Sequence, residues 1–191
     1  MCVWYDTSGI VMIFVFDVFG TLIRPNPNRV NPYRRIFDKG IPVNVMTRDI
    51  SLPDLVKEVG LSAELSAIEE ETQGDLNGYA CYSDTLPTLQ RLQDEGHRVA
   101  VCTNLSPLYG ELVYALLPSR LIEAYVFSYK VGALKPDPMI YRAVCDALQC
   151  LPADITFIGD SMKCDVDGPR NFGMQSRHLN RAAGQLLRDI L

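Results

Sequence analysis

The sequence predicts an α/β fold in which a parallel sheet is covered by helices on both faces. Apolar segments that each end in a polar residue lie at Ile13–Asp17, Val99–Thr103 and Ile155–Asp160. Amphipathic helical patterns separate them, and repeated strand–helix–strand units form parallel sheets. The 191 residues are enough for one domain with a substantial core. A hydrophobic content of 48% and a charged content of 21% are ordinary for a globular protein and argue against disorder.

The first predicted strand begins near Met12 and delivers Asp17 to its C-terminal end. Gly20 then allows the chain to turn sharply away, because glycine adopts backbone angles that other residues avoid. Ligands bind at the carboxyl ends of strands in open parallel sheets, so Asp17 is placed where chemistry occurs. An Asp after a strand is also often only a turn residue or a helix N-cap, and this segment alone leaves both interpretations open.

A region with a different character lies between residues 25 and 83. Prolines interrupt its first part, and two helical patterns follow at Leu52–Val59 and Ala63–Asn77. The triple glutamate Glu69–Glu71 is expected to be a solvated helix face rather than a metal site. These patterns predict a small helical insertion between the first and second strands of the sheet.

The remaining predicted elements alternate between helices and strands. Helical periodicity is found at Asp84–Asp94, Leu108–Leu117, Pro138–Leu148 and Cys164–Phe172. Strands are predicted at Arg98–Thr103, Tyr125–Phe127, Ile155–Ile158 and Gln175–Leu179. In such a sheet the polar ends of neighbouring strands lie at one edge, which is where we expect the functional site.

Charge and cysteine content limit the class of partner. The formal net charge of −5 disfavours nucleic acid, because binding to a phosphate backbone needs a basic face. The apolar segment Ile10–Phe16 is too short to span a bilayer and follows no basic segment, so we expect neither a membrane partner nor a secretion signal. Six cysteines at no metal-ligand spacing are expected to be reduced thiols of a cytoplasmic protein. We expect a small-molecule substrate, and the sequence indicates no oligomeric state.

Four groups of polar residues occur in an order that is typical of one enzyme superfamily. In chain order these are Asp17, Thr103, Lys135 and the pair Asp160 and Asp165. In order and context they resemble the four motifs of the haloacid dehalogenase (HAD) superfamily. The resemblance implies a Rossmann-like parallel sheet with strand order 5-4-1-2-3 and a small α-helical cap. It divides the chain into a core of residues 10–24 and 84–191 and a cap of residues 25–83.

The resemblance implies a nucleophile and a metal ion. Asp17 would attack phosphorus and form an aspartyl-phosphate, which divides one difficult displacement into two easier ones. Asp17, Asp160 and the backbone carbonyl of Phe19 would hold Mg²⁺, which prefers oxygen ligands and reduces the repulsion between two anions.

Four further residues complete the implied site. Thr103 and the amide of Asn104 would donate hydrogen bonds to the transferring group. Lys135 would add a positive charge where negative charge accumulates. Asp165 would orient Lys135 or a metal-bound water.

Phe19 departs from the phosphatase pattern of the superfamily. Those enzymes usually carry a second Asp two residues after the nucleophile, which serves as general acid and base. Phe19 transfers no proton, and such help is worth roughly 10²–10⁴ in rate. The stretch Asp17–Thr21 instead resembles the first motif of 2-haloacid dehalogenases, and Tyr141 matches a tyrosine of those enzymes. Halide leaves without protonation, so that reaction needs no acid.

The fourth motif favours a metal-dependent enzyme. Metal-independent dehalogenases of the superfamily have a Ser–Ser–Asn arrangement in the fourth motif, with Ser in place of the metal-binding acid. This chain has Asp160 at that position, and Met162 stands where those enzymes have Asn. Without a cation, a second carboxylate beside Asp17 would repel an anionic substrate. We therefore predict a Mg²⁺-dependent phosphohydrolase that acts on a small phosphorylated metabolite. A metal-independent 2-haloacid dehalogenase-like hydrolase and a catalytically weak binding or regulatory protein remain as alternatives.

Other polar side chains have weaker claims to a functional role. His97 precedes a strand at the end of the sheet away from Asp17. His178, near the end of the last strand, is expected to have a structural role. Arginines in or near the insertion could hold a substrate phosphate or carboxylate, although surface solvation explains most of them. These are Arg24, Arg29, Arg34 and Arg35.

Overall fold

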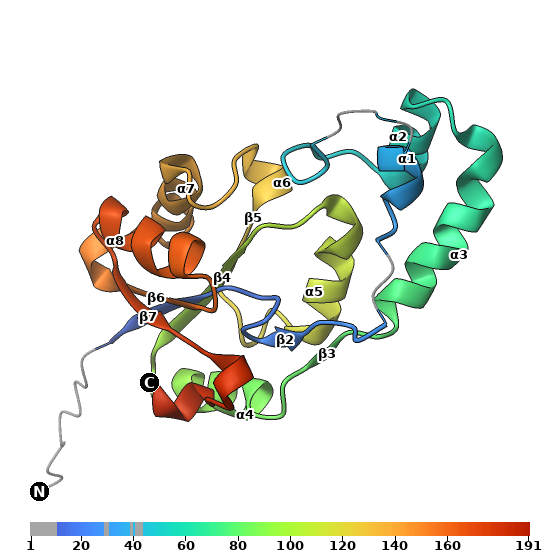
Figure 1. Cartoon of the computed structure of the whole chain (residues 1–191). Coiled ribbons are helices and arrows are strands. Elements are labelled where there is room, and N and C mark those ends of the chain that lie inside the picture. Colours follow the sequence, from blue (N-terminus) through green and yellow to red (C-terminus); the bar gives the residue numbers. More distant parts are fainter. Residues whose placement is uncertain (1–10, 29–30, 39, 41–43) are drawn as a thin grey trace, which may run out of the picture.

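A computed structural model describes residues 11–28, 31–38, 40 and 44–191 of the chain. Within these residues, five parallel strands form the main sheet in the order β5–β4–β1–β6–β7 (Figure 1). The strands are β1 (Ile13–Phe16), β4 (Arg98–Thr103), β5 (Ala124–Phe127), β6 (Ile155–Gly159) and β7 (Gln175–His178). Numbered by their sequence within this sheet, they read 5-4-1-2-3 from β7 to β5, which confirms the predicted topology.

The register of the sheet brings the carboxyl ends of β1, β4 and β6 to one edge. Phe16 pairs with Val101 of β4 and with Ile158 of β6. The next residue, Asp17, donates its backbone N–H to the Ile158 carbonyl at 2.8 Å. Asp17 therefore leaves the sheet beside the ends of both neighbouring strands, as the sequence predicts.

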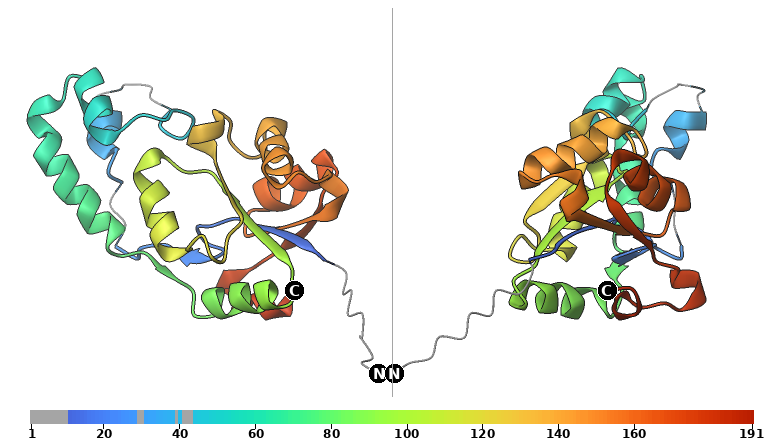
Figure 2. Two further views of the ribbon diagram at one scale, coloured as in Figure 1. Left: turned by 180° about the vertical axis from the view of Figure 1, so that it is seen from behind. Right: turned by 90° about the vertical axis from the view of Figure 1, so that its left-hand side faces the viewer.

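The main sheet is buried on both faces. Its helices are α4 (Thr85–Asp94), α5 (Gly110–Leu116), α6 (Ser128–Val131), α7 (Pro138–Leu148) and α8 (Gly168–Phe172). Phe14 and Phe16 of β1 join the hydrophobic cluster of α4 and α5, whereas Ile13 and Val15 join that of α7. Figure 2 shows helices on either side of the strands. Burial on both faces explains why the central strands are continuous apolar segments rather than alternating ones.

Two predicted helices differ in detail from the structure. The predicted helix Leu108–Leu117 begins with a 3₁₀ turn, Pro107–Tyr109, before α5. The predicted helix Cys164–Phe172 is a π-helical segment, Met162–Asp167, that leads into α8. Apolar periodicity does not distinguish such turns from an α-helix, and π-helical segments are frequent at functional sites.

The described residues between β1 and α4 form a short ribbon and a separate group of helices, which lies to one side of the main sheet in Figure 1. The ribbon pairs β2 (Ile23–Arg24) antiparallel with β3 (Ala80–Cys81). The helices are α1 (Arg34–Asp38), α2 (Leu52–Glu58) and α3 (Leu65–Leu76), with a 3₁₀ turn at Ser62–Glu64. The two predicted helices correspond to α2 and α3. The group has its own hydrophobic cluster of Tyr33, Ile36, Val45, Leu55, Val56, Leu61 and Ile68. The division of the chain at residues 25 and 83 stays a prediction.

The described part of the chain contains five free thiols, as the sequence predicts for these cysteines. They are Cys81, Cys102, Cys145, Cys150 and Cys164. Cys2 and the rest of residues 1–10 lie outside the described residues. None of the described helices has both the length and the apolar character that a membrane crossing requires. The cytoplasmic location stays a prediction.

The segment after β7 folds back over α4 and the loop that follows β1. It contains two 3₁₀ turns, Arg181–Ala183 and Leu187–Asp189. The Arg181 guanidinium donates to the Thr21 carbonyl at 2.8 Å and forms an ion pair with Asp84 at 2.9 Å. Because the Arg181 side chain is only 7% exposed, solvent screens these contacts little. They fix the loop that leads away from the candidate site.

We predict that Arg181→Ala lowers the free energy of unfolding by about 3 kcal/mol, because it leaves the largely buried Asp84 carboxylate without its cation. Arg188→Ala is the matched control. The Arg188 side chain is 78% exposed, and its removal should change stability by less than about 0.5 kcal/mol. Urea unfolding of the three proteins measures both effects. Equal stability of the two variants would show that Arg181 does not hold the loop.

Candidate active site

A buried ammonium group lies between two carboxylates at the carboxyl edge of the sheet. The Lys135 Nζ is 2.6 Å from Asp17 Oδ1 and 2.7 Å from Asp165 Oδ1. It also donates to the Cys102 carbonyl of β4 at 2.9 Å. The Lys135 side chain is 2% exposed, so protein groups rather than water stabilise its charge. Residues that are far apart in the sequence thus meet in one cluster.

The side chain of Asn104 fixes the backbone that carries Lys135. Its Nδ2 donates to the Lys135 carbonyl at 3.0 Å, and its Oδ1 accepts from the Lys135 N–H at 2.7 Å. Asp137 then caps α7 by accepting from the Met139 N–H at 2.8 Å. The sequence did not indicate this positioning contact. The hydrogen bonds expected from Asn104 and from Thr103, which is buried at the end of β4, to a transferring group stay predictions.

Asp165 has a partner on each of its carboxylate oxygens. Oδ1 faces Lys135, and Oδ2 accepts from the Ser161 backbone N–H at 2.9 Å. The π-helical turn after β6 brings Ser161 and Asp165 together. Gly159 leaves the necessary space, because a Cβ there would overlap the Asp165 carboxyl group. This is the geometry that an orienting role for Asp165 requires.

Three carboxylates at the site are placed as the ligands of a cation would be. Oxygens of Asp17, Asp160 and Asp165 lie within 4.8 Å of one another. Asp160 lies where Gly20 leaves space, since φ is +88° at Gly20 and a Cβ there would overlap the Asp160 carboxylate. Hard oxygen ligands of this kind suit Mg²⁺. The donor set therefore fits the predicted metal. Both oxygens of Asp165 are engaged by Lys135 and Ser161, so Asp17 and Asp160 are the carboxylates with more available oxygens.

The charges of Lys135 and the three carboxylates do not balance, because the single ammonium group contacts Asp17 and Asp165 while Asp160 adds a third carboxylate close to both. Burial alone would lower the pKa of Lys135, but the negative charges of Asp17 and Asp165 raise this pKa above its ordinary value. Burial raises the pKa of Asp165 to about 6, although Lys135 acts in the opposite direction. Burial and the negative charge of Asp17 also raise the pKa of Asp160. A bound cation would oppose the shifts of both carboxyl groups, because it stabilises their charged forms.

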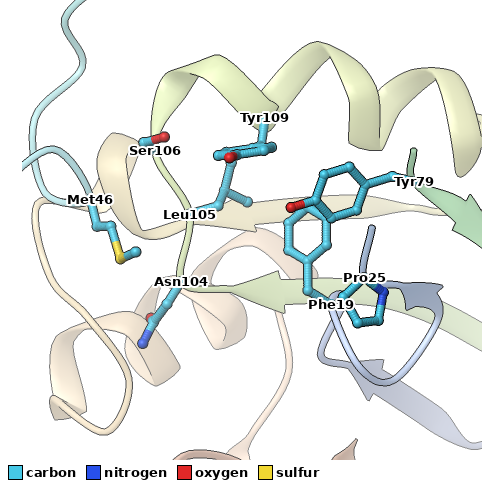
Figure 3. Close-up of a pocket in the computed structure, with 8 residues that line it drawn as sticks. All are labelled: Phe19, Pro25, Met46, Tyr79, Asn104, Leu105, Ser106 and Tyr109. Carbon is cyan, nitrogen blue, oxygen red and sulfur yellow. The ribbon is translucent and has the colours of Figure 1, made fainter. Parts of the chain in front are cut away.

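Phe19, two residues after Asp17, belongs to an aromatic group. Its ring is edge-on to Tyr79 and Tyr109, with centroid distances of 5.3 and 5.8 Å. Figure 3 shows these rings in the wall of a cavity of about 190 Å³. The other residues that line it are Pro25, Met46, Asn104, Leu105 and Ser106. Sequence reasoning did not find the two tyrosines, because they come from separate segments that no motif connects. The role of the Phe19 carbonyl as a metal ligand stays a prediction.

The two histidines lie at opposite ends of the sheet. The His178 Nε2 is 2.9 Å from the backbone oxygen of Asp160, and both residues line a second hollow of about 480 Å³. His178 therefore lies beside Asp160, a candidate metal ligand, and its expected structural role stays a prediction. The His97 Nδ1 accepts from the Met12 N–H at 3.3 Å at the start of β1, far from the carboxylates, as predicted.

The candidate arginines of the insertion are mostly engaged elsewhere or exposed. Arg35 forms ion pairs with Glu71 at 2.7 Å and with Glu64 at 3.2 Å. Glu69 and Glu70 are exposed, as expected for a solvated helix face, and Glu71 is a partly exposed residue that pairs with Arg35. Arg29 lies outside the described residues. The exposed arginines are Arg24 and Arg34.

Tyr141 is a core residue beneath the site. Its hydroxyl donates to the Cys164 carbonyl at 2.6 Å, and its ring packs edge-on against Phe157 with a centroid distance of 5.9 Å. The side chain is fully buried. The tyrosine that matches a dehalogenase residue is thus part of the hydrophobic core in this chain.

The comparison with known proteins identifies the family. A model of the haloacid dehalogenase-like hydrolases matches residues 11–173. The chain belongs to this family. It is 29% identical to an (S)-2-haloacid dehalogenase from Burkholderia cepacia over 53% of the chain, but spans only 44% of that enzyme. It is 25% identical to a glyceraldehyde 3-phosphate phosphatase from Pyrococcus furiosus, over 87% of the chain and 79% of that enzyme.

Solved structures of HAD family enzymes share the fold of this HAD-like chain. An enzyme from Bacteroides thetaiotaomicron, in complex with magnesium and inorganic phosphate, has a TM-score of 0.74 at 16% sequence identity. The similarity covers 94% of this chain and 98% of that chain. At this level of identity the similarity shows the fold alone.

For this HAD-like chain we predict that Asp160→Asn stabilises the metal-free protein against heat at neutral pH, because it removes a negative charge that the carboxylate of Asp17 repels. The raised pKa of Asp160 means that this gain should shrink as the pH falls and the carboxyl group is protonated in both the folded and the unfolded state. Mg²⁺ at about 100 times its Kd should raise the Tm of the unaltered protein by roughly 5–10 °C and leave the variant unaffected.

Thermal melts with and without Mg²⁺ measure this effect, and Asp146→Asn, which removes an exposed acid on α7, is the control. The control should respond to Mg²⁺ as the unaltered protein does. Equal stabilisation of the unaltered protein and Asp160→Asn by Mg²⁺ would remove Asp160 from the ligand set.

Proposed function

We propose that this protein is a Mg²⁺-dependent phosphohydrolase that acts on a small phosphorylated metabolite through an aspartyl-phosphate at Asp17. The observation that carries the proposal is the group of Asp17, Asp160 and Asp165 around Lys135. One ammonium group leaves this cluster with an excess of negative charge, which a divalent cation would balance. Without that cation, the same charge would repel a phosphate ester.

The proposed reaction has two displacements at phosphorus. An oxygen of the Asp17 carboxylate forms a bond to phosphorus, and the bond to the leaving-group oxygen breaks with its electron pair on that oxygen. A water molecule then attacks the phosphorus of the aspartyl-phosphate, and the electron pair of the broken bond returns to Asp17. One proton of the water stays on the released phosphate, and the other neutralises the leaving group.

The side chains around Asp17 would orient the reacting groups. Lys135 faces Oδ1 of Asp17, so we propose that the other carboxylate oxygen attacks phosphorus while Lys135 faces the developing charge. Asp165 keeps Lys135 in place. Thr103 and the backbone amide of Asn104 would donate hydrogen bonds to the phosphoryl oxygens from the end of β4.

We propose that Asp17, Asp160 and the backbone carbonyl of Phe19 hold the Mg²⁺ ion. When bound, the ion supplies the positive charge that reduces the repulsion between the carboxylates and the phosphoryl group. The raised pKa of Asp160 implies that protons compete with the metal, so affinity should rise from acidic to neutral pH.

We propose that residues 25–83 act as a cap over the rest of the chain. The aromatic cavity is lined from both parts, by Met46 and Tyr79 of the cap and by Leu105 and Tyr109 of the core. A substrate in this cavity would contact both parts at once. Its binding would therefore hold the cap against the core and exclude water from the reacting groups.

A metal-independent 2-haloacid dehalogenase is the second candidate. Phe19 in place of an acid favours it, since halide leaves without a proton. The carboxylate of Asp160 beside Asp17 disfavours it, because a haloacid anion would meet an uncompensated negative charge. A binding or regulatory protein would need neither a nucleophile nor the arrangement around Lys135.

We predict that Phe19→Asp raises kcat/KM for alkyl phosphates by at least about tenfold, because a general acid at this position is worth roughly 10²–10⁴ in rate. Esters with acidic leaving groups, such as 4-nitrophenyl phosphate, should gain least. Phosphate release in the presence of Mg²⁺ measures the effect, and circular dichroism shows that the variant is folded.

Phe19→Asn is the matched control, because the Asn side chain has nearly the shape of Asp but cannot act as a general acid for the leaving group. It should show no gain on alkyl phosphates. Halide release from 2-haloacids in EDTA by the unaltered protein, together with no gain for folded Phe19→Asp, would reverse the assignment in favour of the dehalogenase.

A further inference from the structure

The aromatic cavity has apolar walls. Phe19, Tyr79 and Tyr109 are edge-on to one another, and the other apolar residues of the lining in Figure 3 are Pro25, Met46 and Leu105. The lining residues in the described part of the chain carry no formal charge. The cavity is therefore unlike a site that holds a second phosphate, a carboxylate or a sugar, for which charged or hydrogen-bonding side chains are needed.

The side chains of Asn104, Ser106 and Tyr109 in the cavity wall already have hydrogen-bond partners within the protein. Asn104 uses both ends of its amide in the contact with the Lys135 backbone. The Ser106 hydroxyl accepts from the Tyr33 hydroxyl at 2.9 Å. The Tyr109 hydroxyl donates to the Asp75 carboxylate at 2.9 Å. A charged group that entered the cavity would lose its water without gaining comparable hydrogen bonds, which is unfavourable.

We infer that the cavity accepts an uncharged aromatic leaving group, so that the preferred substrate is a phosphate monoester of a phenol. This inference rests on the proposed phosphohydrolase function. An apolar cavity of about 150 Å³ is large enough to bind benzene, so the 190 Å³ available here accommodates a single six-membered ring. Edge-to-face contacts with the three aromatic side chains would hold that ring in place.

The absence of an acid at position 19 indicates the same substrate class by an independent argument. An alkyl phosphate releases a strongly basic alkoxide, which needs a proton as the phosphorus–oxygen bond breaks. A phenol is far more acidic, so the electron pair of that bond can remain on the phenolic oxygen until water supplies a proton. Phe19 thus provides a surface for the ring where a general acid would provide a proton.

The second hollow, which Asp160 lines, has a different character. His178, Asn180 and Arg181 are among the residues that line it. A polar leaving group would find hydrogen-bonding partners there rather than in the aromatic cavity. The ratio of kcat/KM between esters with apolar and with polar leaving groups therefore shows whether the leaving group binds in the aromatic cavity or in the second hollow.

Two matched esters test the inference in the full-length chain with Mg²⁺. Phenyl phosphate and 3-carboxyphenyl phosphate release phenols of similar acidity, but only the second carries a charge on its ring. We expect kcat/KM to be higher for phenyl phosphate by at least about tenfold, because the cavity offers the carboxylate no partner. Glycerol 1-phosphate should be slower than phenyl phosphate by about 10²–10⁴. Equal rates for the two aryl esters, or faster hydrolysis of the charged one, would overturn the inference.

A charge placed in the cavity should change the preference. The Met46 side chain lines the cavity and is 38% exposed, so Met46→Lys should be tolerated by the fold. We expect this variant to reduce the preference for phenyl over 3-carboxyphenyl phosphate by at least about tenfold, through pairing with the carboxylate. Met139→Lys adds the same charge at a 60% exposed site on α7 and should leave the preference unchanged. The same change in both variants would show that the ring does not bind in the cavity.

Binding measurements separate failure of the inference from failure of the proposed function. If no ester is hydrolysed with Mg²⁺, the phosphohydrolase function is wrong, and calorimetry with phenylphosphonate and 3-carboxyphenylphosphonate still tests the cavity. Tighter binding of phenylphosphonate would support an aromatic site, and equal or absent binding of both would overturn it. Fast Mg²⁺-dependent hydrolysis of glycerol 1-phosphate relative to phenyl phosphate would leave the phosphohydrolase standing and overturn the inference.

Discussion

The structure of the site depends on one ammonium group that is surrounded by more carboxylates than it can neutralise. Lys135 brings Asp17 and Asp165 together across the sheet. Asn104 holds the backbone of Lys135, and Asp160 adds a further negative charge. Such a cluster is held by the fold at a cost in stability, because buried like charges repel one another. A cation that binds there would recover this free energy, so metal binding and folding stability should be coupled.

The aromatic ring at position 19 connects the chemistry of the site with the shape of the cavity. Phe19 removes proton transfer from its position and, with Tyr79 and Tyr109, forms an apolar wall. The strongly charged cluster and the uncharged cavity are connected through Asn104, which lines the cavity and holds the backbone of Lys135. A substrate that suits both has an anionic end for the metal and lysine side and an apolar end for the rings.

The elements of the main sheet could be predicted because buried parallel strands are continuous apolar segments that end in polar residues. For the same reason, the convergence of Asp17, Lys135 and Asp165 followed from the strand order that the resemblance implied. The positions of Tyr79 and Tyr109 did not follow, since contacts between distant segments leave no local pattern. The π-helical turn that positions Asp165 and the positioning contact of Asn104 depend on backbone geometry, which side-chain periodicity does not encode.

The covalent state of Asp17 during turnover tests the central claim most directly. The protein would be mixed with phenyl phosphate, quenched in acid within the first turnovers and digested, and the modified residue located by mass spectrometry. The account predicts a phosphoryl group on Asp17 that forms with Mg²⁺ and is absent in EDTA. An ester between Asp17 and the carbon skeleton of a 2-haloacid, formed in EDTA without any phosphoryl adduct from phosphate esters, would contradict it.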